Sequence, residues 1–311
     1  MFCVTYSCCA ILAVHKLLRK AVGTMQTISE ISKVKALVGE WRRSGYTIGF
    51  VPTMGYLHEG HKSLIQKSVD ENDKTVVSIF VNPTQFAPSE DLDKYPQDVH
   101  ADTDMCNNAG VDLIFLPSVK EMYPTGNYST YVYVEGLTYE LCAKSRPGHF
   151  RGVCTIVNKL FNIVAADRAY FGQKDAQQLA VITKMVQDLN MNVEIIPCPT
   201  IREADGLAKS SRNIYLSPEE RNAARVVSKA ILEGERLVKA GERDVSRVIK
   251  SMEDLITTEP LARIDYVEVV DGHNLAKMEN EICEKSLILG AVAVFFGKTR
   301  LIDNFVVDMK G

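Results

Sequence analysis

The chain has 311 residues, of which 46% are hydrophobic and 24% charged, with a formal net charge of -3 and a pI of about 6.1. This length can bury a sizeable core, and it favours two domains or one domain with a smaller appendage. The chain lacks the broad basic field of a nucleic-acid-binding protein, which excludes that class, whereas a small anionic substrate held by a few local cations fits the composition.

Cysteine usage and the N-terminal segment both favour a cytoplasmic protein. The eight cysteines are scattered without a Cys-x-x-Cys pair, which is typical of reduced, mostly buried thiols. The apolar run from Phe2 to Val14 is too short to span a bilayer, and its positive charges follow it, whereas a secretion signal has them in front. We therefore interpret residues 1–24 as an N-terminal extension of unknown role, or as the result of a mis-set start upstream of Met25, and expect no membrane association.

From residue 26 onward, helical and β patterns alternate. Apolar residues at helical spacing predict a helix from Gln26 to Arg43, and a strand follows at Ile48 to Val51. A helix that opens at His61 leads to a second buried strand at Lys74 to Val81, which ends before Pro83. This strand, helix, strand order predicts a parallel crossover.

The alternation continues to about residue 200 and then changes. About five parallel strands interleaved with helices predict a Rossmann-like α/β domain over residues 25–200, followed by a smaller α+β C-terminal domain over residues 201–311. In the first domain we expect helices at Tyr95–Ala109, Val153–Ala165 and Asp175–Asp188 and strands at Leu113–Leu116, Ala169–Phe171 and Asn192–Pro197. In the second we expect helices at Pro218–Ala240 and Val245–Thr257 and β runs at Ile264–Val270 and Leu287–Phe296.

The segment GFVPTMGYLHEGH, residues 49–61, is the most informative part of the chain. A strand enters a glycine-containing turn, and His58 and His61 follow three residues apart at a helix start. Unpaired amides and the dipole of a helix N-terminus attract phosphate, so both imidazoles can reach one triphosphate. An isolated His-x-x-His is equally compatible with plain structure. Zinc is disfavoured, because the metalloprotease pattern spaces its histidines one residue further apart.

Four further polar segments follow predicted strands, where parallel sheets bind their ligands. Gln85 in NPTQF can orient a small polar substrate or be a satisfied loop amide. The cationic loop SRPGHFRG, residues 145–152, can bind an anion or be a solvated surface. Lys174 in YFGQKDAQQ is expected at a helix N-terminus, where the dipole disfavours a cation, so its presence suggests an anionic ligand. Residues 201–213 add hydroxyls and a guanidinium suited to phosphate.

In this order the five segments resemble the pantoate–β-alanine ligase (pantothenate synthetase) family of the nucleotidyltransferase superfamily. The resemblance extends from Met25 to Asn304 and rests on PTMGYLHEGH, VNPTQFAPSEDLDKYP, RPGHFRGV, YFGQKDAQQ, TIREADGLAKSSRNIYLS and GKTRLIDN. It implies ATP-dependent condensation of pantoate with β-alanine to pantothenate, AMP and pyrophosphate through a pantoyl adenylate, in the pathway to coenzyme A. It also implies ATP as a substrate, Mg²⁺ bridging its phosphates, and a homodimer.

The resemblance also assigns individual residues. It makes His61, His58, Lys174, Ser210, Ser211 and Arg212 catalytic, with His61 in the place of the family's proton donor. We favour a phosphate-binding role for His61, because pyrophosphate needs no proton before release. Gln85 and Gln178 bind pantoate, Gln85 also lies near β-alanine, and Asp102 helps to hold Mg²⁺. The nucleotide contacts are Met54, Gly55, Tyr56, Leu57, His58, Glu59, Gly60, His61, Gly172, Gln173, Lys174, Asp175, Ile201, Lys209, Ser210, Ser211 and Arg212.

Two departures and two other function classes accompany this assignment. Lys209 stands where many relatives have Met, and Gln173 replaces the more usual Glu; we expect no loss of activity from the Gln173 exchange. A nucleotide sensor without turnover would fit the same fold, as would a superfamily enzyme that transfers AMP to another acid. The presence of Gln85, Gln178 and Lys174 disfavours the sensor, and the loops around Gln85 and residues 146–152 disfavour the other transferase.

Overall fold

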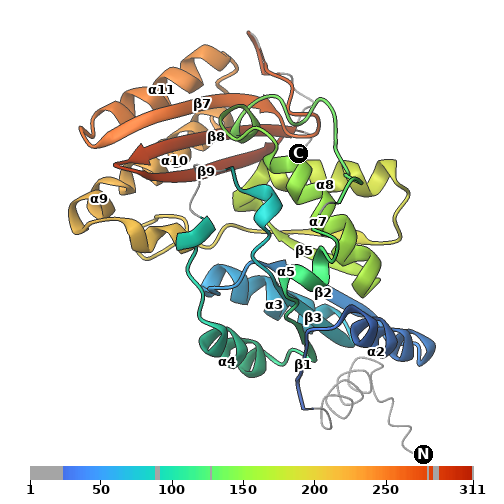
Figure 1. Cartoon of the computed structure of the whole chain (residues 1–311). Helices are drawn as coiled ribbons and strands as arrows, with labels where there is room; N and C mark the ends of the chain where they lie inside the picture. Colours follow the sequence, from blue (N-terminus) through green and yellow to red (C-terminus); the bar gives the residue numbers. More distant parts are fainter. Residues whose placement is uncertain (1–23, 88–91, 127, 279, 283–286, 310–311) are drawn as a thin grey trace, which may run out of the picture.

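The computed structural model describes residues 24–309 except residues 88–91, 127, 279 and 283–286. The predicted N-terminal extension lies outside the described residues apart from Thr24. Two β-sheets organise the chain: a parallel sheet of six strands and an antiparallel sheet of three (Figure 1). The fold class predicted from the sequence, Rossmann-like α/β with a smaller α+β part, is confirmed. The division at residue 200 stays a prediction.

The N-terminal sheet has the strand order β1-β4-β3-β2-β5-β6. Its strands are β1 (Gln26–Ile28), β2 (Ile48–Thr53), β3 (Lys74–Ile79), β4 (Leu113–Phe115), β5 (Arg168–Gly172) and β6 (Glu194–Cys198), and all pairings are parallel. From β2 the chain continues to β3 and β4 on one side, and from β5 it continues to β6 on the other side. The carboxyl ends of these two neighbouring strands therefore form the topological switch point, where such sheets bind ligands.

Helices cover both faces of this sheet because alternate strand residues are apolar on each side. Phe50 and Val76 face a core with helices α2 (Ile31–Arg43), α7 (His149–Val164) and α8 (Ala176–Asp188). Val51 and Val77 face the opposite core, with α3 (Glu59–Glu71) and α4 (Val99–Ala109). Two short helices, α5 (Val119–Met122) and α6 (Cys142–Ser145), lie in the long connection from β4 to α7.

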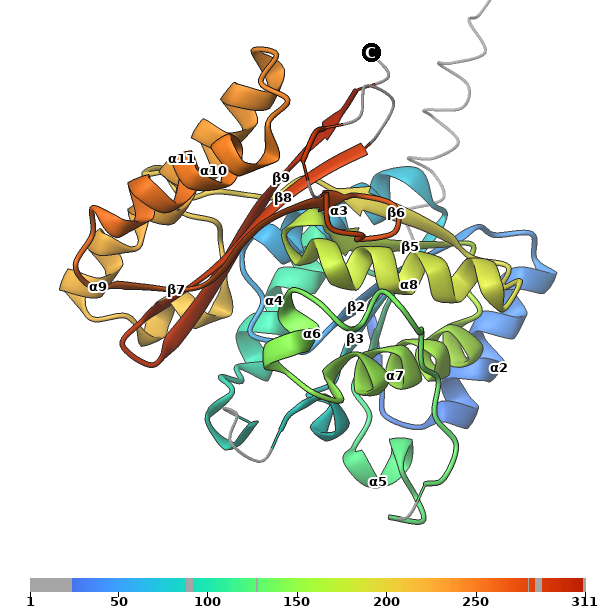
Figure 2. The same cartoon turned by 90° about the horizontal axis from the view of Figure 1, so that it is seen from above.

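The C-terminal sheet is a meander of β7 (Ala262–Asp271), β8 (Leu287–Phe296) and β9 (Thr299–Asp308). One face packs on α10 (Arg225–Lys239) and α11 (Val245–Thr257), which follow the short helix α9 (Pro218–Ala223). The other face contributes Leu289, Ala291 and Ile302 to the core that contains α7 and α8. The sheet thus lies between its own helices and the N-terminal half, as Figure 2 shows from above. Within the described part of the chain, no helix is long and apolar enough to traverse a bilayer.

Two helices of the N-terminal half begin later than the sequence predicted. The helix expected from Gln26 begins only at Ile31, because residues 26–28 pair with β4 and supply a sixth strand. The helix expected from Tyr95 begins at Val99, where the Asp98 side chain accepts a hydrogen bond from the Ala101 amide. Pro96 disfavours helical geometry before that point.

Two further differences concern the C-terminal half. The helix expected over residues 218–240 divides at Ala224 into α9 and α10, and no glycine or proline marks that break. The third strand, β9, was not predicted, although Gly297 and Lys298 form a two-residue connection typical of a β-hairpin. The four described cysteines, Cys106, Cys142, Cys154 and Cys198, are free and buried, as expected for that part of the chain.

Candidate active site

The turn after β2 is held by a buried carboxylate. Gly55 has φ +83°, and an added Cβ would lie 3.0 Å from Asp102 Oδ2. The amides of Tyr56 and Leu57 donate to the two oxygens of Asp102 at 2.8 and 2.6 Å. Asp102 is 2% exposed, and burial raises the pKa of its carboxyl. Its contacts fix the backbone that leads into the two histidines.

His58 and His61 form the start of α3 and cap it reciprocally. The helix begins at Glu59, two residues earlier than expected, with His58 as its N-cap. The Gly60 amide donates to His58 Nδ1 at 3.1 Å, and the His58 amide donates to His61 Nδ1 at 3.3 Å. The ring centroids are 4.1 Å apart. The predicted juxtaposition of both imidazoles at a helix N-terminus is present in the structure.

Both rings are neutral near pH 7, and their hydrogen bonds assign the tautomer. Burial, followed by the charge of Lys174, lowers the pKa of His58 to about 4. Burial, followed by His58 and Lys174, lowers the pKa of His61 to about 3. Since each Nδ1 accepts a backbone hydrogen bond, the single ring proton resides on Nε2. Each imidazole therefore has an N–H donor left for a ligand.

Lys174 lies in the turn that ends β5, beside the histidines. Gln173–Asp175 form a single 3-10 turn before α8, so Lys174 precedes the helix N-terminus by two residues. The carbonyls of Gln173 and Lys174 accept hydrogen bonds from Asn304 Nδ2 of β9, at 3.0 and 2.8 Å. The switch point thus brings the ends of β2 and β5 together, and a strand from the C-terminal sheet holds the second of them.

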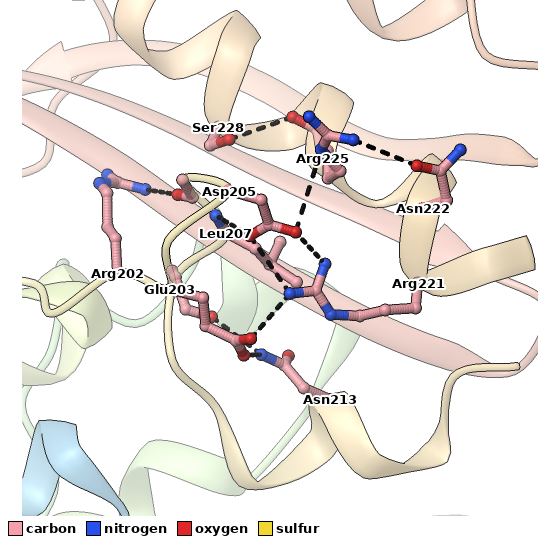
Figure 3. Close-up of polar contacts among 11 residues, drawn as sticks. Arg202, Glu203, Asp205, Leu207, Asn213, Arg221, Asn222, Arg225 and Ser228 are labelled. Carbon is pink, nitrogen blue, oxygen red and sulfur yellow. Dashed lines mark hydrogen bonds and ion pairs between the residues drawn. The ribbon is translucent and has the colours of Figure 1, made fainter. Parts of the chain in front are cut away.

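A polar cluster shapes the loop over residues 202–213 (Figure 3). Arg221 donates to Asp205 at 2.7 and 3.2 Å and to Glu203 Oε2 at 2.7 Å. Asn213 Nδ2 donates to Glu203 Oε1 and to the Ala208 carbonyl. The Lys209 amide donates to the Ile201 carbonyl at 2.9 Å. These contacts fold the loop back on itself, so that its last part, Lys209 to Arg212, faces the N-terminal half, where Lys209 pairs with Glu59.

That segment closes the site from the C-terminal side. Lys209 Nζ lies 3.1 Å from Glu59 Oε2 in the first turn of α3. Ser210 caps the 3-10 helix Ser211–Tyr215, and its Oγ accepts a hydrogen bond from the Arg212 amide at 3.3 Å. A cavity of about 1050 Å³ lies between the two halves. Its lining includes the predicted residues Lys174, Asp175, Gln178, Ser210 and Arg212.

Gln85 is held rigidly beside the turn after β2. It is 9% exposed, its Oε1 accepts from Asn82 Nδ2 at 3.2 Å, and its Nε2 lies 3.1 Å from Met54 Sδ. His149 Nδ1 lies 2.8 Å from the Gln85 carbonyl, and Arg146 Nη1 lies 2.9 Å from His149 Nε2. Because an arginine can only donate, the proton of His149 is on Nδ1 and points at Gln85.

Sequence reasoning missed several of these residues. Asn304 and its neighbour Asp303 stand in GKTRLIDN, a motif to which the sequence alone assigned no role. His149 was included only as part of a cationic loop, whereas it bridges that loop to Gln85. Asp102 was predicted as a metal ligand, but both of its oxygens accept backbone amides. No group of three or more His, Cys, Asp or Glu among the described residues could hold a metal ion.

Comparison with known proteins relates this geometry to a family. The profile of a family described as pantoate-beta-alanine ligase matches residues 26–306. The chain belongs to this family. A pantothenate synthetase of Acetivibrio thermocellus is 60% identical over 285 residues, which cover 92% of this chain and all of that protein. One from Enterococcus faecalis is 54% identical over 92% of this chain and all of that protein. Homology at this level makes the chain a ligase.

Solved structures of pantothenate synthetases share the fold. The enzyme from Thermus thermophilus superimposes with a TM-score of 0.84 at 44% identity, over 90% of this chain and 99% of that one. The pantoate-beta-alanine ligase of Francisella tularensis superimposes with a TM-score of 0.74 at 34% identity, over 92% of this chain and 98% of that one. The Francisella structure contains beta-gamma ATP and beta-alanine.

Proposed function

We propose that this chain condenses pantoate with β-alanine, with cleavage of ATP to AMP and pyrophosphate, through an enzyme-bound pantoyl adenylate. Family membership supports the overall reaction, and the Francisella complex supports ATP and β-alanine as ligands. The observation that carries the proposal is the meeting of the His58–His61 pair with Lys174 at the switch point, across from Ser210 and Arg212.

The first half-reaction is an in-line displacement at phosphorus. A pantoate carboxylate oxygen forms a bond to the α-phosphorus as the bond to the bridging oxygen breaks and pyrophosphate leaves. The protein contributes position and charge neutralisation to such a step. We assign the two Nε2–H groups of His58 and His61 and the Lys174 ammonium to the phosphate oxygens. Neutral donors fit the His61 role we favour, because a ring with a pKa of about 3 carries no second proton to give at pH 7.

The nucleotide contacts divide between the two halves of the chain. On the N-terminal side we assign Met54 to His61 and Gly172 to Asp175, which belong to the turns after β2 and β5. On the C-terminal side we assign Ile201 and Lys209 to Arg212. Lys209 pairs with Glu59, so a phosphate bound here would compete with Glu59 for this cation.

The second half-reaction makes the amide bond. The β-alanine amine attacks the activated carbonyl carbon, the bond from that carbon to the AMP oxygen breaks, and the nitrogen loses a proton. We assign pantoate to Gln85 and Gln178 and place β-alanine near Gln85. The fixed Gln85 amide suits this role, because an oriented amide recognises a hydroxyl or carboxylate without ordering first.

The proposal that Mg²⁺ is a cofactor rests on the family resemblance alone. Asp102, the residue predicted to help hold it, is 2% exposed and accepts two backbone amides of the turn after β2, which favours a structural role for its carboxylate over a metal-binding one. Mg²⁺ usually keeps several waters and binds substrate phosphates with few protein ligands. No step above depends on a metal held by the chain. The predicted cytoplasmic location likewise stays a prediction.

We also propose that the ligase is a homodimer. Residues 128–134 form neither helix nor strand, and the Val132 amide of this segment donates to Thr155 Oγ1 of α7 at 3.1 Å. Tyr131 and Tyr133 in this segment are 45% and 49% exposed. Exposed aromatic side chains of this kind can pack against their own copies around a two-fold axis. Sedimentation equilibrium should give twice the chain mass at micromolar concentration, and a monomer mass would contradict the proposal.

Pyrophosphate release tests the reaction itself. Protein with Mg-ATP and pantoate alone should release about one pyrophosphate per active site, since the adenylate stays bound, and β-alanine should then start continuous turnover to pantothenate and AMP. Protein that binds ATP but releases no pyrophosphate with pantoate would contradict the assignment. A panel of other carboxylic acids would then test the alternative transferase.

A further inference from the structure

Strand β9 touches both phosphate-facing parts of the site through two successive residues. Successive side chains of a strand project to opposite faces. On β9, Leu301 and Phe305 face the α10–α11 core, whereas Ile302 and Val306 face the core of α7 and α8. Asp303 belongs to the first series and Asn304 to the second. One strand can therefore contact the C-terminal loop on one side and the N-terminal half on the other.

Asn304 holds the turn that carries Lys174. Its side-chain amide donates to the carbonyls of Gln173 and Lys174 at 3.0 and 2.8 Å, and the residue is 7% exposed. Two hydrogen bonds from one rigid NH₂ group to consecutive carbonyls restrict the backbone on both sides of the Lys174 Cα. The starting point of the lysine side chain is thereby tied to β9.

Asp303 holds the base of the opposite loop. It is 2% exposed and accepts a bidentate pair from Arg202, with Nη1–Oδ2 at 2.6 Å and Nη2–Oδ1 at 3.0 Å. Arg202 Nη1 also donates to the Gly206 carbonyl at 3.2 Å, which closes the loop that leads to Ser210 and Arg212. Bidentate arginine–carboxylate pairs fix geometry as well as charge.

The two contacts form one unit. The backbone amide of Asn304 donates to Asp303 Oδ1 at 2.8 Å, so a displacement of either residue is transmitted to the other. Lys174, Ser210, Arg212, Asp303 and Asn304 all line the same cavity between the two halves. The pair thus sets how far the Lys174 turn stands from the Ser210–Arg212 segment.

We propose that Asp303 and Asn304 are positioning residues for adenylation, which act through Lys174 and through the Arg202 loop. The inference deepens the proposed function and rests on it. It predicts that substitutions of Asp303 or Asn304 lower kcat/KM for ATP in pyrophosphate release and leave KM for β-alanine unchanged. A merely structural role would lower folding stability and all kinetic constants together.

The test replaces Asn304 by alanine in the parent protein and in the Lys174→Ala variant. In the otherwise unchanged chain, Asn304→Ala should lower kcat/KM for ATP in pantoate-dependent pyrophosphate release about 10- to 100-fold, because displacements of about 1 Å have effects of this size. KM for β-alanine should stay within about twofold. In a Lys174→Ala background, the same change should lower kcat/KM by less than about threefold, because residues that act as one unit are not additive. Asp303→Asn should resemble Asn304→Ala in direction.

A matched control separates positioning from general docking of the two halves. Lys277 Nζ, in the connection from β7 to β8, lies 3.3 Å from Glu140 Oε2 across the same interface, and neither residue lines the cavity. Lys277→Ala should leave kcat/KM for ATP within about threefold, the range expected for exposed ion pairs. Thermal unfolding should show that all variants are folded at the assay temperature.

Three results would overturn the inference: a loss of less than about threefold for Asn304→Ala, an equal loss in both backgrounds, or an equal loss for Lys277→Ala. Failure of the proposed function can be distinguished from failure of this inference, because the protein without any substitution would then release no pyrophosphate with pantoate. In that case calorimetry would measure the affinity of the same variants for a non-hydrolysable ATP analogue. A loss of affinity in Asn304→Ala that is absent in the Lys174→Ala background and in the control would support the positioning role, and any other pattern would overturn it.

Discussion

Replacing Gly152 by alanine should separate stability from catalysis. Gly152 lies in the first turns of α7, where the helix crosses the loop that carries Gln85. An added Cβ would lie 2.4 Å from the Thr84 carbonyl oxygen and 2.7 Å from both Gln85 N and Gln85 Cα. All three atoms are backbone, so no flexible side chain can move aside. Ordinary contact requires about 3.4 Å, and the helix or the Gln85 loop must therefore shift by about 1 Å.

The two consequences differ in size. Overpacking costs about 1–3 kcal/mol, while alanine in a helix gains about 1 kcal/mol over glycine, so the net loss in the free energy of unfolding is about 0–2 kcal/mol. A shift of about 1 Å at a substrate-orienting group lowers kcat/KM about 10²-fold, which corresponds to about 2.7 kcal/mol. We expect a folded protein whose kcat/KM for pantoate is about a hundredth of the parent value.

Urea unfolding and pantoate-dependent pyrophosphate release measure the two effects. Gly39→Ala in α2 is the matched control, because its added Cβ would meet only the flexible Arg43 Nη1 at 3.4 Å. That variant should gain about 0.5–1 kcal/mol in stability and keep its kinetic constants. Parent-like kcat/KM for pantoate in Gly152→Ala would refute the link between this helix contact and the Gln85 geometry.

Four further predictions concern single side chains. Lys174→Ala should slow adenylation about 10²- to 10⁴-fold in single-turnover assays, because a charge contact that tightens in the transition state is lost; near-parent turnover would remove Lys174 from the mechanism. Gln85→Ala should weaken pantoate binding more than ATP binding in calorimetry, and the reverse order would overturn its assignment. Between pH 7.5 and 5.5, folding stability should fall by about 1.4 kcal/mol for each of His58 and His61. Both rings stay neutral in the folded protein, with pKa values of about 4 and 3, while unfolded histidines take up protons near pH 6.5, so His61→Gln should flatten this slope and an unchanged slope would contradict the pKa assignment. Asp102→Asn should destabilise the protein by about 1–3 kcal/mol, because an amide NH₂ replaces one acceptor of a backbone N–H, yet leave the half-saturating Mg²⁺ concentration unchanged; a large rise in that concentration would restore Asp102 as a metal ligand.

Local patterns in the sequence predict the part of the site that lies at the ends of β2 and β5. A buried β run, a glycine turn and the His58–His61 pair are neighbours in the chain, so their spacing alone predicts an N-terminal helix cap with two imidazoles. The same holds for Lys174, which lies two residues after the end of β5. Parallel-sheet topology then brings these two turns together, and the structure agrees with that prediction.

Long-range contacts were not accessible in the same way. Asn304 meets the Lys174 turn across 130 residues of chain, and Asp303 meets Arg202 across 101. No periodicity encodes such pairings. Asp102 shows another limit, because the family resemblance assigned it to Mg²⁺, whereas its contacts with the amides of Tyr56 and Leu57 are known only from the structure. Strand β1 was missed because three residues are too few to show a period of two.

Oxygen transfer tests the pantoyl adenylate most directly. Pantoate labelled with ¹⁸O in its carboxylate should be converted with ATP and β-alanine, and the AMP and pyrophosphate examined by mass spectrometry. Attack of the carboxylate on the α-phosphorus, followed by cleavage of the acyl carbon–oxygen bond, leaves a pantoate oxygen in AMP. The account predicts labelled AMP and unlabelled pyrophosphate. Unlabelled AMP, or label in any other phosphate product, would contradict it.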